Sequence, residues 1–190
     1  MLLIFLSCKT STEDLPILSY SIDQSGQKQF YKITYEGFTN QLGASFTTEN
    51  IKGKNFIANF FFTRCPSICP PMRTTLIAIA EDYSKHDNLI FISHTIDPKH
   101  DSVEVLKTYA EATGIPEKKW QFIRASEEQT KLQAKQYMTN FRPNEEGSDF
   151  YHSSFVALVD QQQNIRGFYN VLIDEDVMRL KKDLNTILAH

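Results

Sequence analysis

The chain has few cysteines, no run of basic residues and no long apolar segment, and each absence excludes a class of protein. Three cysteines among 190 residues are too few for a scaffold held together by disulfides. Twenty basic side chains against 23 acidic ones give a net charge of -3, which does not favour a nucleic-acid partner. No segment approaches the roughly 18 apolar residues that cross a bilayer. What remains is one globular domain, because this length with 41% apolar content can build a single core.

The first eight residues form a short apolar run that ends in Ser7 and Cys8, after which the sequence turns polar. This is the outline of a bacterial lipoprotein signal, in which the cysteine becomes the first mature residue and carries the lipid. The run is shorter than the usual apolar core of about 7–15 residues and lacks a preceding basic segment. Two interpretations stay open, a signal remnant over residues 1–8 with a lipid on Cys8, and an apolar N-terminus with an idle thiol. Residues 9–29 are predicted to be a polar tether, and residues 30–190 the folded domain.

Hydrophobic periodicity predicts an α/β domain. Residues 55–63 are nearly continuous in apolar side chains, as is typical of a strand covered on both faces. Beyond Pro71 the apolar spacing becomes helical. The predicted strands are 30–35, 55–63, 88–96, 120–124, 150–160 and 164–170, with a hairpin over 38–48, and the predicted helices are 72–84, 102–113, 127–138 and one from Asp174. This order describes a mixed sheet with helices on both faces, a thioredoxin-like layout with an N-terminal hairpin and inserted loops.

Cys65 and Cys69 lie between the most buried predicted strand and the first predicted helix. Unpaired backbone amides at a helix start stabilise thiolate, which is both the nucleophile and the metal ligand, and Pro66, Pro70 and Pro71 stiffen the loop. Three intervening residues place the sulfurs about one turn apart, where they can bind one soft cation, Cu(I) or Zn, or close into a disulfide. Two sulfurs leave a metal site incomplete, so a third ligand has to come from elsewhere. The alternative is a pair of inert buried cysteines.

Five histidines are candidates for that third ligand. His86 and His190 are expected in solvent, His94 is expected to be a hydrogen-bonded strand residue, and His100 lies in the loop after that strand. His152 stands at the start of a predicted strand, directly after a long polar loop. From the residues alone the ligand set stays open.

Residues 62–70, which read Phe-Thr-Arg-Cys-Pro-Ser-Ile-Cys-Pro, resemble the SCO/SenC family of copper-binding proteins of the respiratory chain. The resemblance continues through Asp97-Pro98 with Asp101 and through Tyr151-His152-Ser153, in the same order along the chain. It implies a thioredoxin-like fold and one copper ion, Cu(I) or Cu(II), bound by Cys65, Cys69 and His152.

The resemblance also implies a role as a metallochaperone, delivering copper to, or reducing the cysteines of, the binuclear copper centre of a cytochrome c oxidase. The implied partners are the copper-centre subunit of the oxidase and a thiol reductant or copper donor protein. Family members are usually fixed to the membrane by an N-terminal helix, and this chain offers instead the segment that ends at Cys8. The expected location is the bacterial cell envelope, with the domain anchored by lipid and facing the periplasm.

Residues around the proposed ligands have alternative interpretations. Asp97 and Asp101 are candidates for supporting the ligands or contacting a partner, although Asp101 also begins a capping-box pattern with Glu104 and is predicted to cap the helix there. Met72 is expected to pack in the core rather than to bind copper. The loop 139–149 is long for a compact domain and precedes His152, which predicts that copper binding orders this loop.

The same residues support a second hypothesis, a thiol-disulfide oxidoreductase of the cell envelope in which Cys65 and Cys69 form the catalytic, redox-active dithiol. His152 would then only tune a thiolate. Replacement of His152 separates the two hypotheses, because copper binding needs the imidazole and dithiol exchange does not. A peroxiredoxin-like enzyme and a purely structural metal module are weaker alternatives.

Overall fold

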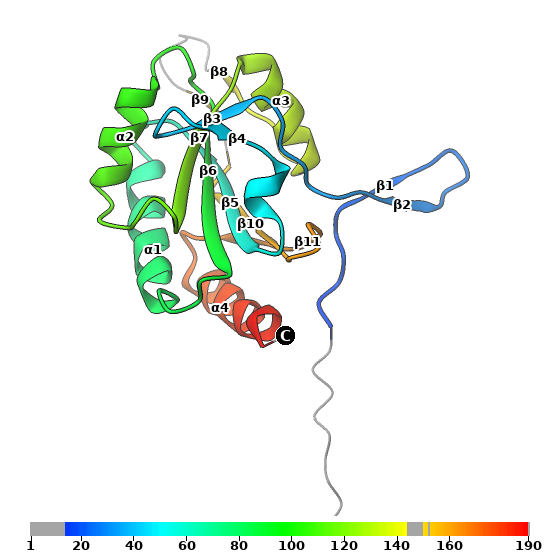
Figure 1. Ribbon diagram of the computed structural model, residues 1–190. Coiled ribbons are helices and arrows are strands. Elements are labelled where there is room, and N and C mark those ends of the chain that lie inside the picture. The colour runs from blue at the N-terminus through cyan, green and yellow to red at the C-terminus, as the bar shows by residue number, and fades with distance from the viewer. Residues whose placement is uncertain (1–13, 144–149, 152, 190) are drawn as a thin grey trace, which may run out of the picture.

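The structure is a computed structural model that describes residues 14–143, 150–151 and 153–189 (Figure 1). Its strands are β1 (Tyr20–Ile22), β2 (Lys28–Phe30), β3 (Phe38–Asn40), β4 (Ser45–Phe46), β5 (Asn55–Phe61), β6 (Leu89–Thr95), β7 (Trp120–Arg124), β8 (Arg142–Pro143), β9 (Phe150–Tyr151), β10 (Phe155–Val159) and β11 (Ile165–Asn170). Its helices are the 3-10 turn η1 (Thr48–Ile51) and the α-helices α1 (Cys69–Asp82), α2 (Val103–Glu111), α3 (Glu127–Gln136) and α4 (Asp174–Leu188). Cys8, His152, His190 and part of the predicted loop 139–149 lie outside the described residues.

A mixed sheet forms the centre of the molecule, with the strand order β11-β10-β5-β6-β7-β3-β4. β5 pairs in parallel with β6, and β6 in parallel with β7, whereas the outer pairs on both sides are antiparallel. Every residue of β5 is buried, which accounts for its continuous apolar run. The carboxyl ends of the three parallel strands share one edge of the sheet, and the chain leads from β5 into the segment of Cys65 and Cys69 at that edge.

Helices cover both faces of this sheet, as the sequence predicts. Phe60 contacts Tyr137 at the end of α3, with 5.7 Å between ring centroids, and the next residue, Phe61, contacts Tyr109 of α2 at 5.2 Å. Because successive side chains of a strand point to opposite faces, α2 and α3 lie on opposite sides of the sheet. Figure 1 places α1 on the side of α2. The predicted mixed α/β sheet is therefore confirmed.

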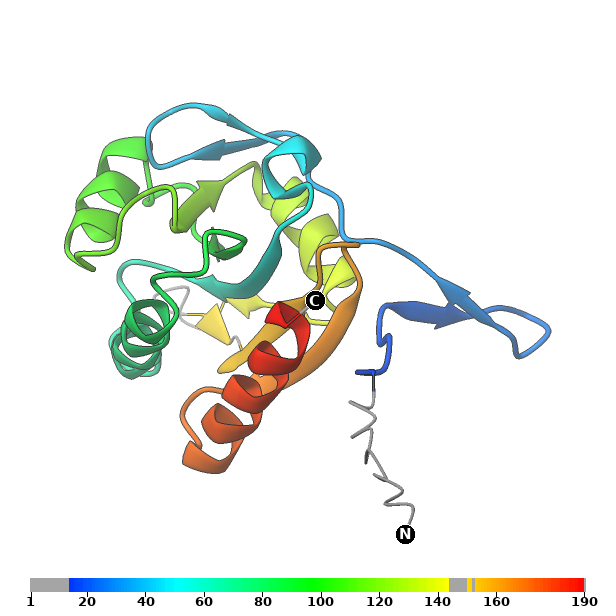
Figure 2. The ribbon, with the colours of Figure 1, turned by 60° about the horizontal axis from the view of Figure 1, so that its bottom comes forward.

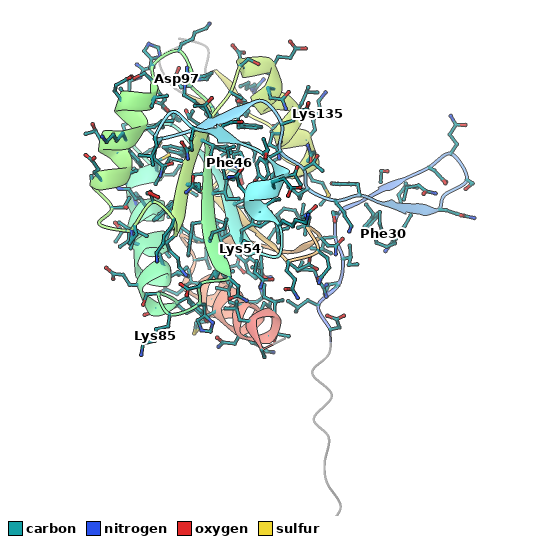
Figure 3. All side chains as sticks on the ribbon, in the orientation of Figure 1. Phe30, Phe46, Lys54, Lys85, Asp97 and Lys135 are labelled. Atoms are coloured by element: carbon teal, nitrogen blue, oxygen red, sulfur yellow. The ribbon has the colours of Figure 1, made fainter. Side chains whose placement is uncertain are left out.

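The N-terminal part differs from the prediction. β1 and β2 pair into a separate hairpin that stands out from the body, and Phe30 lies on it with 59% of its surface exposed (Figures 1, 2 and 3). The predicted strand over 30–35 is wrong, although its alternation is real, because Ile33 and Tyr35 are buried between exposed neighbours. Their backbone groups pair outside a ladder, with the N–H of Ile33 donating to the Gln163 carbonyl at 2.9 Å. Alternation thus marks an extended, half-buried segment here and not a strand.

The residues before β1 are hydrogen-bonded to β11, the strand at one edge of the sheet. Arg166 in β11 donates to the Asp14 carboxylate at 2.6 Å, to the Leu15 carbonyl and to Asp160 at 2.9 Å. The N–H of Leu18 donates to the Ile165 carbonyl at 2.8 Å. Asp14 and Leu15, which belong to the segment predicted to be a tether, thus contact the folded body. Within the described ranges, no helix combines the length and apolar character that a membrane span requires.

Candidate metal and dithiol site

Cys65 and Cys69 lie beyond the carboxyl end of β5, where the chain enters α1. Cys69 is the first residue of α1, and Pro70 and Pro71 follow it in the first turn. Proline has no N–H, and the N–H of Met72 already donates to the Ile68 carbonyl at 3.1 Å. Of the first four positions of α1, only Cys69 therefore directs a backbone N–H at the site.

The sulfur of Cys65 accepts that N–H. The amides of Cys69 and Ser67 both donate to the Cys65 sulfur, and the Ser67 hydroxyl lies 3.8 Å from it. Burial raises the pKa of the Cys65 thiol, but these hydrogen bonds, together with one from the Cys69 thiol, hold the pKa below its ordinary value. Both side chains are buried and are thiols rather than a disulfide. The site favours thiolate, the form that binds metal ions and attacks disulfides.

Asp101 holds the loop in front of Cys65 and does not cap α2. Its buried carboxylate accepts the Thr63 hydroxyl at 2.5 Å, the Thr63 N–H at 3.2 Å and the Thr95 hydroxyl. The N-cap of α2 is Ser102, whose side chain accepts the N–H of Val105 at 3.3 Å. The predicted capping role of Asp101 is therefore wrong, because a neighbouring serine supplies the cap. Burial raises the pKa of Asp101, and the hydrogen bonds from the two threonines oppose that rise only in part.

Asp97 binds the residue directly before Cys65. Its carboxylate, which is 5% exposed, accepts from the Arg64 guanidinium at 2.7 Å and lies 2.8 Å from His100 Nδ1. Burial raises the pKa of Asp97, but the hydrogen bonds with Arg64 and His100 and their positive charge hold it below its usual range. Asp97 and Asp101 thus fix two consecutive residues, Thr63 and Arg64. Figure 3 labels Asp97 at the upper end of the sheet, with Lys54 well below it.

The described histidines do not join the two cysteines. His94 is fully buried on the face of α3, where Nδ1 lies 2.9 Å from the Asn59 carbonyl and Nε2 lies 3.0 Å from the Tyr35 hydroxyl. This confirms that His94 is a hydrogen-bonded strand residue, and His86 is exposed, as expected. His100 stays at the surface beside Asp97. In the part of the chain that the structure describes, no three His, Cys, Asp or Glu side chains form a metal-binding group, and His152 lies outside that part.

Three polar residues near Cys69 were not predicted from the sequence to belong to the site. Asn59, Ser93 and Trp120 line a small cavity with Cys69, and Met72 packs there in the core, as expected. The signal for two of them is a polar residue inside a buried strand, Asn59 in β5 and Ser93 in β6. Such residues need hydrogen-bond partners, so they indicate a polar network in the core.

The geometry supports soft-metal or dithiol chemistry. Two sulfurs lie at the start of a helix, and one of them accepts two backbone N–H groups. Such a pair binds a soft monovalent cation in preference to a hard cation such as Mg²⁺. It can also close into a reversible disulfide. The donor set of the described residues therefore fits copper, provided that one further ligand joins it.

Comparisons with known proteins agree with this chemistry. The SCO1/SenC family model matches residues 23–188. The SCO1 protein homolog of Bacillus subtilis is 26% identical over 143 residues, which cover 74% of this chain and 74% of that protein. The crystal structure of a SCO1/SenC family lipoprotein from Bacillus anthracis has a TM-score of 0.76 at 24% identity, covering 90% of this chain and 96% of that one.

A further solved structure, of Arabidopsis thaliana ScoI with copper bound, has a TM-score of 0.68 at 24% identity, covering 82% of this chain and 97% of that one. These similarities establish the thioredoxin-like fold that the sequence predicts. Because the family model spans nearly the whole described chain, this protein belongs to the SCO1/SenC family.

Proposed function

We propose that this protein is a copper metallochaperone that binds one copper ion through Cys65, Cys69 and His152. It then delivers the ion to the binuclear copper centre of a cytochrome c oxidase, whose copper-centre subunit is the partner. The observation that carries the proposal is the Cys65 sulfur, which accepts two backbone N–H groups beside Cys69 at the start of α1. Membership of the SCO1/SenC family and the copper-bound structure of Arabidopsis ScoI support it.

Copper suits this ligand set in both of its common oxidation states. Two thiolates and one imidazole can hold Cu(I) in a trigonal arrangement and Cu(II) when an oxygen ligand joins. The Thr63 and Arg64 contacts of Asp101 and Asp97 support the proposal, because they fix the loop that leads into the first sulfur ligand. The two carboxylates act on the ligands through that loop, as outer-shell groups of metal sites commonly do.

The proposed location is the outer face of a bacterial membrane, with a lipid on Cys8 and the domain facing the periplasm. The related lipoprotein of Bacillus anthracis supports a lipid anchor. Metabolic labelling of cells with a fatty-acid analogue tests this, since Cys8→Ser should abolish incorporation. Label retained by the Cys8→Ser protein would contradict the anchor without affecting the copper site.

The copper proposal is tested by anaerobic titration of the reduced protein with Cu(I) and, separately, with Cu(II). Wild type should bind one copper, Cys65→Ser and Cys69→Ser should lose tight binding, and His152→Ala should lose Cu(II) before Cu(I). His86→Ala is the matched control, because His86 is exposed, and it should titrate like wild type. The loaded protein should then transfer copper to the isolated copper-binding domain of an oxidase subunit. Wild-type Cu(II) binding by the His152→Ala variant would overturn the proposed ligand set.

The hydrogen bond from the Cys69 thiol to the Cys65 sulfur favours a second candidate, a thiol-disulfide oxidoreductase of the envelope. Here the two thiols reduce a partner disulfide and become a disulfide themselves, releasing two electrons and two protons to the partner. Turnover of a disulfide substrate that survives His152→Ala would favour this function. Turnover absent in wild type, with copper transfer intact, would exclude it.

A further inference from the structure

A small cavity lies on the core side of Cys69, between α1, α2 and the sheet. Its polar lining consists of Asn59, Arg73, Ser93, Tyr109 and Trp120. Its volume is about 10 Å³, which is close to the space that one water molecule needs. Cys69 and the polar side chains of the sheet thus share one cavity.

Hydrogen bonds fix the direction of these polar groups. The Trp120 indole Nε1, which can only donate, donates to the Ser93 hydroxyl at 2.8 Å. The Ser93 hydroxyl in turn donates to Asn59 Oδ1 at 2.7 Å. Because the oxygen of the Asn59 amide is held by Ser93, its NH₂ group has to point away from Ser93.

The Asn59 NH₂ group stands at the end of this chain of hydrogen bonds. Asn59 is 93% buried, and Nδ2 makes no hydrogen bond to any residue within the described ranges. Asn59 lines the cavity, so its NH₂ group is available to an acceptor or to a water molecule there. Cys69 lines the same cavity, and a reduced cysteine sulfur can accept a hydrogen bond.

We propose that Asn59 is a positioning residue for the dithiol, which donates a hydrogen bond to the Cys69 sulfur across the cavity, where one bridging water fits. The indole of Trp120 and the hydroxyl of Ser93 hold the amide in the donating orientation. This stabilises the reduced form of Cys69 from the core side, while backbone amides donate to the Cys65 sulfur from the side of the helix. The inference rests on the proposed function in that it concerns the same two sulfurs, but it needs no copper.

The test is the reduction potential of the Cys65–Cys69 pair, measured without copper by equilibration with a dithiol buffer. Reduction of the disulfide takes two electrons and two protons from the buffer dithiol, which becomes a disulfide. Asn59→Leu, which keeps the shape and removes the donor, should shift the equilibrium about tenfold towards the protein disulfide, or about 30 mV more negative. Ser93→Ala, which frees the amide to turn, should shift the potential in the same direction by less.

A matched control separates this effect from a loss of stability. Tyr35→Phe removes a buried hydroxyl that contacts His94 and Tyr137 on the opposite face of the sheet, so it weakens the core without touching the cavity. Its potential should equal that of wild type. An unchanged potential in Asn59→Leu, or an equal shift in Tyr35→Phe, would overturn the proposal.

If Asn59→Leu fails to fold, wild-type protein still provides the test. The side-chain amide resonances of Asn59 should move when the dithiol is oxidised, while those of exposed Asn140 should not. Resonances of Asn59 that ignore the redox state would contradict the hydrogen bond. Neither measurement involves copper, so a failed copper titration and a failed Asn59 experiment are distinguishable.

Discussion

The Arg64 guanidinium donates to the Asp97 carboxylate at 2.7 Å, which joins the residue before Cys65 to the loop after β6. Asp101, four residues further on, accepts a hydrogen bond from the Thr63 hydroxyl. The loop that carries the first cysteine is therefore held from one side by two buried carboxylates. A change at either carboxylate should reach the sulfurs through the backbone, without any direct contact.

Asp97→Ala should weaken Cu(I) binding by about tenfold, because loss of a group that orients a ligand commonly costs 10–100-fold in metal affinity. Its effect on the free energy of unfolding should stay within about 1 kcal/mol, since Arg64 is 48% exposed and can be solvated. Competition with a Cu(I) chelator measures the affinity. Asp82→Ala, which breaks the exposed pair with Lys181 far from the cysteines, is the control and should bind copper like wild type.

Asp101→Ala should lower the free energy of unfolding by about 3 kcal/mol, because it leaves the Thr63 N–H and two hydroxyl groups without their buried acceptor. Ser102→Ala should cost about 1 kcal/mol, the usual effect of losing an N-cap. Urea unfolding of both variants measures the difference. The reverse order of the two costs would restore Asp101 as the cap of α2.

Stability should fall with acidification near pH 6, because of His94. Burial lowers the pKa of His94 to about 4, although its hydrogen bond with the Asn59 carbonyl opposes the shift. An unfolded histidine has a pKa of about 6.5, so the unfolded state binds the proton first as the pH falls, and stability is lost between 6.5 and 4. The expected loss from pH 7.5 to 5.5 is about 1.4 kcal/mol. His94→Gln should flatten this dependence in urea unfolding, and exposed His86→Gln should not.

Gly167→Ala should destabilise the protein by about 2–3 kcal/mol, because the new Cβ would overlap the Tyr169 side chain. Displacement of that ring should also weaken the 2.7 Å hydrogen bond from the Tyr169 hydroxyl to Asp183. Tyr169→Phe removes only this hydrogen bond and should cost about 1 kcal/mol. Thermal unfolding compares the two. A smaller loss in Gly167→Ala than in Tyr169→Phe would mean that the ring adapts.

Much of the fold was predictable because its central elements carry strong local patterns. The buried strand β5 and the helical spacing after Pro71 fix the order of strand and helix around the site. The hairpin of β1 and β2 was missed because its strands are only three residues long and expose Phe30 and Ile22. Short exposed strands lack the alternation on which such predictions depend.

The site was predictable in part. The spacing of Cys65 and Cys69 sufficed for the sulfur pair, and the resemblance to a family supplied His152, which stays a prediction. The contacts of Asp101 could not be foreseen, because residues 101–104 satisfy a capping pattern while Thr63 and Thr95 approach only in the folded chain. The same is true of Asn59, since its partner Ser93 comes from the neighbouring parallel strand.

The position of Trp120 has a practical consequence. It is the single tryptophan of the chain, and it lines the same small cavity as Cys69. Its fluorescence therefore comes from one known place, the cavity that Cys69 also lines. Binding of a paramagnetic or heavy metal ion at Cys69 should quench this fluorescence. Loading and release of the ion can then be followed in real time without an added dye.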